Sequence, residues 1–337
     1  MAIRLGRGTA ELASRPAILG QAAVGGQTEQ EGPLGHVFAQ VFAEAHLGEK
    51  CWEMAETRLQ QASMSHALER AHCAPEGIDL HLGGDLLNQC SATSFALREL
   101  GIPLAGIYSA CASFAQALAM GALALESGAF GKVSACASSH FCAAEKQFRF
   151  PLEFGGQAPP TAQRTATAAG AAILGTGVGP RISRVIFGKV TDLGVKNANE
   201  MGAAMAPAAW DTLKRFLQDT ESKPGDFDMI LTGDLGGIGS ALLQELARTE
   251  AGLDIASVHQ DCGLLLYDTE EQDAGVGGSG VGCSAAVLCG EIFPKLQSGE
   301  LRRVLFLGTG ALLSAVSPLQ GESIPAVAHG VELTADS

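Results

Sequence analysis

The stretch Tyr108-Ser109-Ala110-Cys111-Ala112-Ser113 decides the fold, because it places a cysteine between a run typical of a buried strand and a run typical of a buried helix. The run of residues 100–125 contains no charged side chain and would be long enough to cross a bilayer. Pro103, Gly106 and several polar residues interrupt the run, however, and favour a strand over residues 104–108 followed by a helix over residues 112–127.

Cys111 differs from the other cysteines by this position at the start of a helix. The backbone N–H groups and the dipole of a helix N-terminus favour an anion, so we expect a lowered thiol pKa and a nucleophilic sulfur. The alternative is an inert buried thiol, which is what most of the nine cysteines should be.

The chain contains an internal repeat on both sides of this turn. Gly83-Gly84-Asp85-Leu86 resembles Thr232-Gly233-Asp234-Leu235, and Glu126-Ser127-Gly128 resembles Gln297-Ser298-Gly299. Each copy predicts a strand into a Gly-Asp turn, a helix, a second strand, a turn of small residues, an apolar helix and a closing strand, the last at residues 132–137 and 303–307. Alternating strands and helices predict an α/β fold of two duplicated halves, residues 1–180 and 181–337.

Composition narrows the class of protein. Among 337 residues, 36 are acidic and 22 are Lys or Arg, which gives a net charge of −14 and argues against nucleic-acid binding. The odd cysteine count and the absence of an apolar signal core predict a reducing, cytoplasmic setting. Residues 275–280 match the GxGxxG pattern but do not directly follow a strand, so we expect no nucleotide cofactor, and we expect no metal cofactor.

The two-copy layout, the turn at Cys111 and the segment Gly278-Ser279-Gly280-Val281-Gly282-Cys283-Ser284 resemble the thiolase superfamily. More narrowly, the chain is similar to the stage V sporulation protein AD family from residue 10 to residue 332. The motifs that carry this resemblance are Ser138-Ser139-His140, Glu145-Lys146-Gln147-Phe148-Arg149-Phe150-Pro151, Glu153-Phe154-Gly155-Gly156-Gln157, Asp261-Cys262-Gly263, Gly308-Thr309-Gly310-Ala311-Leu312-Leu313-Ser314 and Gln320-Gly321-Glu322-Ser323-Ile324-Pro325.

The resemblance implies a thiolase-like fold of five layers, αβαβα. It also implies a protein that binds dipicolinic acid (pyridine-2,6-dicarboxylate) during its uptake into the developing spore, with calcium as a potential companion ion. The implied partners are other proteins of the spore channel operon, several of them membrane proteins, so peripheral association with the spore inner membrane is expected. The superfamily further implies a homodimer that pairs through a strand near residues 132–137.

Catalysis in this superfamily needs a histidine beside the cysteine, and the resemblance implies that both usual histidines are absent. Ser279 stands where thiolases have theirs, and Gly233-Asp234 stands where ketoacyl synthases have theirs. We therefore expect a binding protein with no catalytic residues. Two alternatives stay open: a condensing enzyme or acyltransferase that uses Cys111 with His140 or His259 as base, and a purely structural subunit. We interpret His259 as a loop residue that precedes a strand at 264–267.

A flat ring with two carboxylates needs charge-assisted donors and an apolar wall. The run from His140 to Arg164 supplies donors among phenylalanines and follows a predicted buried strand. Surface ion pairs with Glu145 or Glu153 would explain Lys146 and Arg149 equally well. Asp261 is a candidate to hold a donor in place or to bind calcium. The complete predicted ligand-binding set is Cys111, His140, Lys146, Gln147, Arg149, Arg164, Asp261, Ser279 and Gly280.

Overall fold

The structure is a computed structural model that describes residues 1–148 and 158–336. Its main strands are β3 (Ala17–Gly26), β5 (Leu80–Gly84), β6 (Leu104–Gly106), β7 (Lys132–Ser139) and β9 (Ala168–Gly175), and β10 (Arg181–Ile186), β11 (Met229–Thr232), β12 (His259–Asp261), β14 (Arg303–Ala311) and β15 (Ala326–Thr334). Shorter strands are β1 (Ile3–Arg4), β2 (Thr9–Glu11), β4 (Gln40–Phe42), β8 (Arg164–Thr165) and β13 (Gly278–Ser279).

The two halves of the chain have the same strand order. The first half runs β6-β5-β7-β9-β3 and the second runs β12-β11-β14-β15-β10. In each half, the last strand along the chain (β9 or β15) runs in the opposite direction to the other four strands. The repeat of both order and direction confirms the predicted duplicated α/β fold, although the boundary at residues 180/181 stays a prediction.

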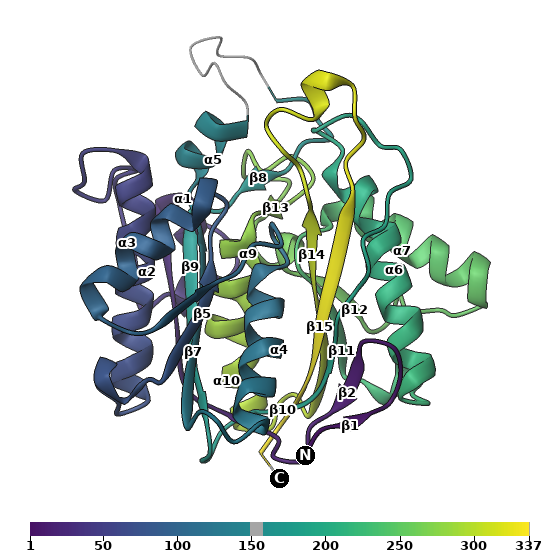
Figure 1. The fold of residues 1–337 in the computed structure, drawn as a ribbon. Coiled ribbons are helices and arrows are strands. Elements are labelled where there is room, and N and C mark those ends of the chain that lie inside the picture. The colour runs from purple at the N-terminus through teal and green to yellow at the C-terminus, as the bar shows by residue number, and fades with distance from the viewer. Residues whose placement is uncertain (149–157, 337) are drawn as a thin grey trace.

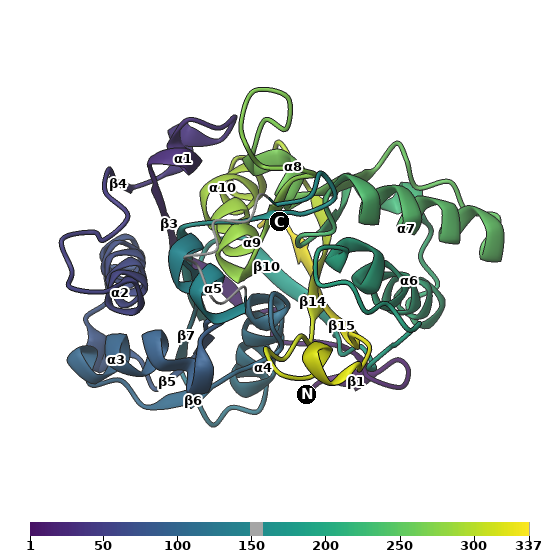
Figure 2. The same ribbon diagram turned by 90° about the horizontal axis from the view of Figure 1, so that it is seen from above.

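Helices cover and separate the two halves of the sheet in five layers (Figure 1). The view from above shows the same order, with α4 and α9 in the middle (Figure 2). The first outer layer contains α2 (Trp52–Arg70) and α3 (Ser91–Leu100), the central layer contains α4 (Ser113–Glu126) and α9 (Val281–Val287), and the second outer layer contains α6 (Met201–Asp219) and α7 (Gly236–Ala251).

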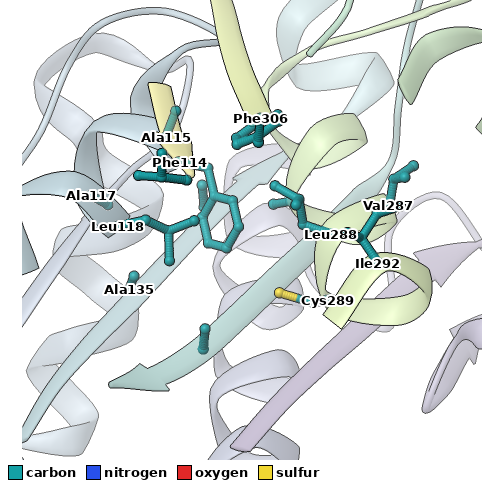
Figure 3. Packing of buried hydrophobic residues seen from close by; sticks show 14 of the residues in the cluster. Phe114, Ala115, Ala117, Leu118, Ala135, Val287, Leu288, Cys289, Ile292 and Phe306 are labelled. Atoms are coloured by element: carbon teal, nitrogen blue, oxygen red, sulfur yellow. The ribbon is translucent and has the colours of Figure 1, made fainter. Parts of the chain in front are cut away.

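The central layer is apolar because sheet covers it on both sides. Figure 3 shows Phe114 and Leu118 of α4 packed close to Phe306 of β14 and to Leu288, which follows α9 in a π-helical turn (Leu288–Ile292). All four side chains are completely buried. Each contributes about 1.5–3 kcal/mol of hydrophobic stabilisation. The chain then continues into α10 (Phe293–Ser298).

Two expectations about local structure were wrong. Residues 264–267 are not a strand, because α8 (Cys262–Leu266) begins directly after β12, and His259 lies in β12 rather than in a loop. The strand proposed for dimer pairing is β7, which has β5 on one side and β9 on the other. Its backbone groups are already paired inside the sheet, so β7 cannot add a strand from a second copy.

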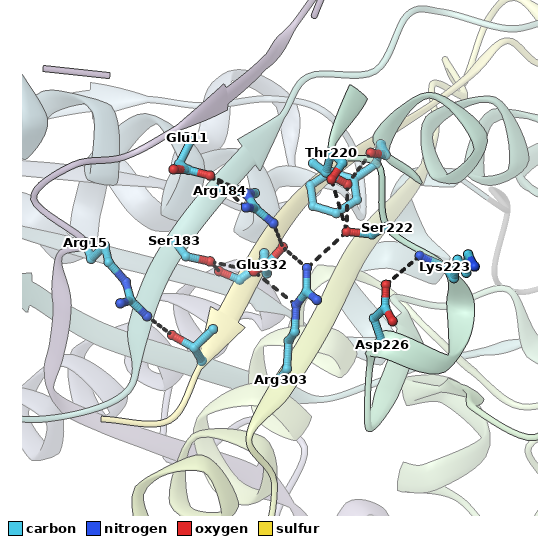
Figure 4. A network of polar contacts seen from close by, with 12 residues as sticks. Glu11, Arg15, Ser183, Arg184, Thr220, Ser222, Lys223, Asp226, Arg303 and Glu332 are labelled. Carbon is cyan, nitrogen blue, oxygen red and sulfur yellow. Dashed lines mark hydrogen bonds and ion pairs between the residues drawn. The ribbon is translucent and has the colours of Figure 1, made fainter. Parts of the chain in front are cut away.

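A polar network fixes the second half at the end near both termini (Figure 4). Glu332 of β15 is buried and pairs with Arg184 of β10 at 3.2 Å and with Arg303 of β14 at 3.1 Å. Ser183 donates a further hydrogen bond to Glu332 at 3.0 Å, and Arg184 also pairs with Glu11 of β2 at 2.7 Å. Two cations and two anions balance, so the network holds four strands in register with no residual charge.

Candidate functional site

The turn that carries Cys111 is held in a strained backbone conformation. Ala110 has φ of 48°, which is unfavourable for a residue with a Cβ. The Ser113 hydroxyl accepts a hydrogen bond from the backbone N–H of Ser109 at 2.9 Å and donates one to the carbonyl of Ala110 at 2.7 Å. These bonds hold the bend between β6 and α4 and fix Cys111 at the start of the helix.

Residues from the second half of the chain surround the Cys111 thiol. Three groups of the second half act on the pKa of this thiol, namely the Asp234 carboxylate, the Gly280 N–H and the Ser279 hydroxyl, and Ser279 lines the same cavity as Cys111. Asp234 itself accepts hydrogen bonds from Ser279 Oγ and from the Gly280 N–H, each at 3.1 Å, and from Thr309 Oγ1 at 2.8 Å. The structure therefore brings together three predicted residues, Cys111, Ser279 and Gly280, around a fourth that the prediction omitted.

In the sequence, Asp234 stood out as part of the repeated Gly-Asp turn and at the place where ketoacyl synthases have a histidine, but it was not predicted to bind a ligand. Its equivalent in the first half, Asp85, accepts hydrogen bonds from the N–H of Leu87 and from the N–H and hydroxyl of Thr93. The Gly-Asp turn thus has a structural use in one half and faces the cysteine in the other. Nothing local to the motif distinguishes these two environments.

Burial, and then the negative charge of Asp234, raise the pKa of the Cys111 thiol well above its usual range. The Gly280 N–H and the Ser279 hydroxyl act in the opposite direction but do not reverse the shift. Burial also raises the pKa of Asp234 to about 6. The expectation of a lowered thiol pKa was therefore wrong: the thiol is neutral at pH 7, because a carboxylate and burial outweigh the helix N-terminus.

A largely apolar cavity opens beside the sulfur, with about 600 Å³ of empty space including its mouth. Among its described lining residues there is no Lys, Arg or His, and Glu145 is the charged one. The lining residues are Leu86, Tyr108, Ala110, Cys111, Ala144, Glu145, Phe148, Thr165, Ala198, Met201, Ser279, Ala311 and Leu313. The described wall of this cavity therefore supplies no positive charge.

Three predicted ligand-binding residues in and before α5 (Phe141–Phe148) do not line this cavity. His140 is buried, and its Nε2 lies 2.6 Å from the carbonyl of Ala45. Lys146 forms a surface ion pair with Glu53 at 2.5 Å. The ion-pair interpretation of Lys146 therefore fits better than ligand binding, although the partner is Glu53 and not Glu145 or Glu153. Gln147 donates to the carbonyl of Leu86 at 2.8 Å and accepts from the N–H of Asn88. Arg149, Phe150, Pro151 and residues 153–157 lie outside the described residues.

Asp261 is used entirely by the fold. One carboxylate oxygen accepts from the N–H groups of Gly236 and Gly263, and the other accepts from the N–H of Leu235 and from the Thr232 hydroxyl, all at 2.7–3.0 Å. It therefore caps the beginnings of α7 and α8. Within residues 1–148 and 158–336, no group of three or more His, Cys, Asp or Glu side chains is placed to hold a metal ion.

The two histidines of the second half do not line the Cys111 cavity. His259 lies 3.0 Å from Thr232 Oγ1, and His329 accepts from the N–H of Gly188 at 3.2 Å and lies 3.4 Å from Ser109 Oγ. Burial lowers the pKa of each to about 4, so both are neutral at pH 7. Neither histidine is among the groups that act on the pKa of the Cys111 thiol.

Arg164 lies in β8, one residue before Thr165 of the cavity wall, but its side chain lines a different cavity. No helix in the described parts of the chain combines the length and the hydrophobicity needed to cross a membrane.

The family model of stage V sporulation protein AD matches residues 6–334. Stage V sporulation protein AD of Bacillus subtilis (strain 168) is 42% identical over 307 residues, which covers 91% of this chain and 90% of that protein.

Solved structures of similar fold are condensing enzymes of low sequence identity. Crystal structures of 3-oxoacyl-[acyl-carrier-protein] synthase III from Aquifex aeolicus VF5 (TM-score 0.58, 13% identity) and of an OleA variant from Xanthomonas campestris (TM-score 0.61, 16% identity) each cover at least 95% of this chain and 99% of the other. At such identity these two structures show the shared thiolase-like fold alone.

Proposed function

Because this chain belongs to the family of stage V sporulation protein AD, we propose that it is a non-catalytic binding protein for dipicolinic acid, and that it supports uptake of this acid into the developing spore. The described fold is thiolase-like, and a cavity opens beside Cys111.

The observation that carries this proposal is the position of the Asp234 carboxylate, which accepts hydrogen bonds from Ser279 and Gly280 beside Cys111 and raises the pKa of its thiol. A condensing enzyme needs a thiolate as nucleophile and a nearby group that exchanges protons at neutral pH. Here the Asp234 carboxylate raises the thiol pKa, and neither His259 nor His329 lines the cavity. A thiol in this state is poorly suited to form an acyl-enzyme, which supports a binding role for the protein.

The Cys111 cavity itself offers aromatic and thioether surface from Tyr108, Phe148 and Met201, but its described wall contains no cation. Calcium as a companion ion and contact with membrane proteins of the spore channel operon at the inner spore membrane are part of this proposal and rest on the family alone.

A homodimer would have to use a free sheet edge. β6 is such an edge, since β5 is its one described neighbour, and Leu104 and Tyr108 beside it are 40% and 48% exposed. We expect antiparallel pairing of two β6 strands. Replacing Leu104 with Lys should shift the molecular mass measured by light scattering from dimer to monomer; a wild-type monomer would remove this part of the proposal.

The decisive test is calorimetric titration of the purified protein with pyridine-2,6-dicarboxylate, with the 3,5-isomer and acetyl-CoA as controls. Saturable binding of the 2,6-isomer alone supports the proposed function. Turnover of acetyl-CoA, or an acyl adduct on Cys111 detected by mass spectrometry, would show that the protein is a condensing enzyme. An absence of binding by every compound would leave a structural subunit.

A further inference from the structure

Arg164 carries a guanidinium with unused hydrogen-bond donors. Its Nε is buried without a partner, and its Nη1 reaches the carbonyl of Asp273 only at 3.5 Å. No described carboxylate lies within ion-pair distance of this guanidinium, in a chain of net charge −14. Unsatisfied donors are costly, so a ligand that accepts hydrogen bonds from the reachable end of this guanidinium gains affinity.

The backbone fixes the direction of this side chain. β8 pairs with β13, with Arg164 opposite Gly278 and Thr165 opposite Ser279. Successive residues of a strand point to opposite sides. Thr165 therefore lines the Cys111 cavity, whereas Arg164 lines a second cavity behind it, with about 1,410 Å³ of empty space including its open mouth.

The second cavity offers surfaces that suit a planar acid. The guanidinium carbon of Arg164 lies 4.3 Å from the centre of the Phe141 ring, so one face of the guanidinium is covered and its edge stays free. Pro159, Pro160 and Gln163 line the same cavity. A guanidinium edge binds a carboxylate through two parallel hydrogen bonds, and flat apolar residues stack on a ring.

Acidic residues also line this cavity, namely Glu145 and Asp273. They weaken the attraction for an anion, so binding requires that the carboxylate contact the guanidinium of Arg164 directly. An acid with a carboxylate adjacent to a ring nitrogen or ring edge can do so while its ring lies along the wall formed by Phe141 and the prolines.

We propose that Arg164, backed by Phe141, binds a carboxylate of a planar aromatic acid in this second cavity, separately from the Cys111 cavity. The identity of that acid as dipicolinate rests on the proposed function. The proposal explains how a protein of this family could bind a dianion although the described wall of the Cys111 cavity contains no cation.

The first arm of the test is calorimetry with pyridine-2,6-dicarboxylate. We expect Arg164→Gln to weaken binding at least about tenfold, and Arg164→Lys to recover only part of the affinity, because Lys keeps the charge but loses the two parallel hydrogen bonds. Arg98→Gln is the matched control: Arg98 also lies over a ring, that of Phe95 at 5.1 Å, but on the surface and paired with Glu99. Its affinity should match that of the wild type.

The second arm separates the two cavities. Ala198 lines only the Cys111 cavity and is partly exposed, so Ala198→Trp narrows that cavity with little disturbance of the core. Affinity within about twofold of the wild type is expected. Wild-type affinity in Arg164→Gln together with a large loss in Ala198→Trp would overturn the inference and place the ligand beside Cys111. Failure of the wild type to bind the dicarboxylate would instead overturn the proposed function.

A third measurement needs no substitution, in case Arg164→Gln does not fold. In the ¹⁵N-labelled wild-type protein, the Arg164 Nε–H resonance should move saturably as the dicarboxylate is added, with the dissociation constant found by calorimetry. The Arg98 resonance should stay in place. A fixed Arg164 resonance under saturating ligand would refute the inference directly.

Discussion

Replacing Asp234 with Asn should make Cys111 more reactive. Two unit charges about 4 Å apart at an effective dielectric constant of about 20 interact by about 4 kcal/mol, which is about 3 pKa units for the thiol. Removing the carboxylate therefore raises the thiolate fraction about 10³-fold at a given pH. The thiolate of a more acidic thiol is intrinsically less nucleophilic. A Brønsted coefficient of about 0.5 therefore cancels half of the logarithm of this increase in thiolate fraction. The net expectation is alkylation about 30-fold faster.

The assay is the rate of iodoacetamide labelling at pH 8, followed for the Cys111 peptide by mass spectrometry. Asp85→Asn is the matched control, because Asp85 occupies the equivalent turn of the first half and contacts Leu87 and Thr93. Labelling of Cys51 and Cys142, which are partly exposed, reports general unfolding. An Asp234→Asn variant that labels at the wild-type rate or more slowly would refute the claim that this carboxylate keeps the thiol neutral.

Four further outcomes are expected. The folded pKa of Asp234 is raised by burial to about 6, so its stabilising contribution is present below about pH 4 and is lost as the pH rises through 6. Asp234→Asn should therefore gain up to about 3 kcal/mol relative to the wild type between pH 4 and pH 7 in denaturant unfolding. Asp261→Ala should lose about 3 kcal/mol or more in the same assay, since four donors lose their acceptor. Gly280 has φ of +92° and an added Cβ would lie 2.6 Å from Ser139 Oγ, so Gly280→Ala should lower the melting temperature clearly. Lys146→Ala should change stability by less than about 1 kcal/mol and leave dicarboxylate affinity unaltered, because its ion pair with Glu53 is half exposed.

Local patterns were sufficient for the architecture. The Gly-Asp turns, the Ser-Gly turns and the apolar runs around Cys111 and residues 303–307 predicted two copies of one α/β unit, and the strand order of both halves agrees. Hydrophobic period and turn chemistry act between residues that are close along the chain, and therefore they can be read without coordinates. The same holds for Ser279 and Gly280, whose glycine-rich turn stands in the sequence as a motif.

Which polar side chains meet was decided by the tertiary structure. His140, Lys146 and Gln147 are suitable donors by residue type, but they bond to Ala45, Glu53 and Leu86 because α5 and its neighbours bring those groups within reach. Likewise, β7 reads as a plausible pairing strand until both of its neighbours are known.

The sequence by itself determined the duplicated fold, the turn at Cys111 and the family. The tertiary structure decided that the pKa of the Cys111 thiol is raised and not lowered, since it placed a carboxylate of the second half near a buried thiol of the first. The physical reason is range: strand, helix and turn preferences arise within a few residues, whereas a pKa depends on burial and on charges that only the folded chain brings together.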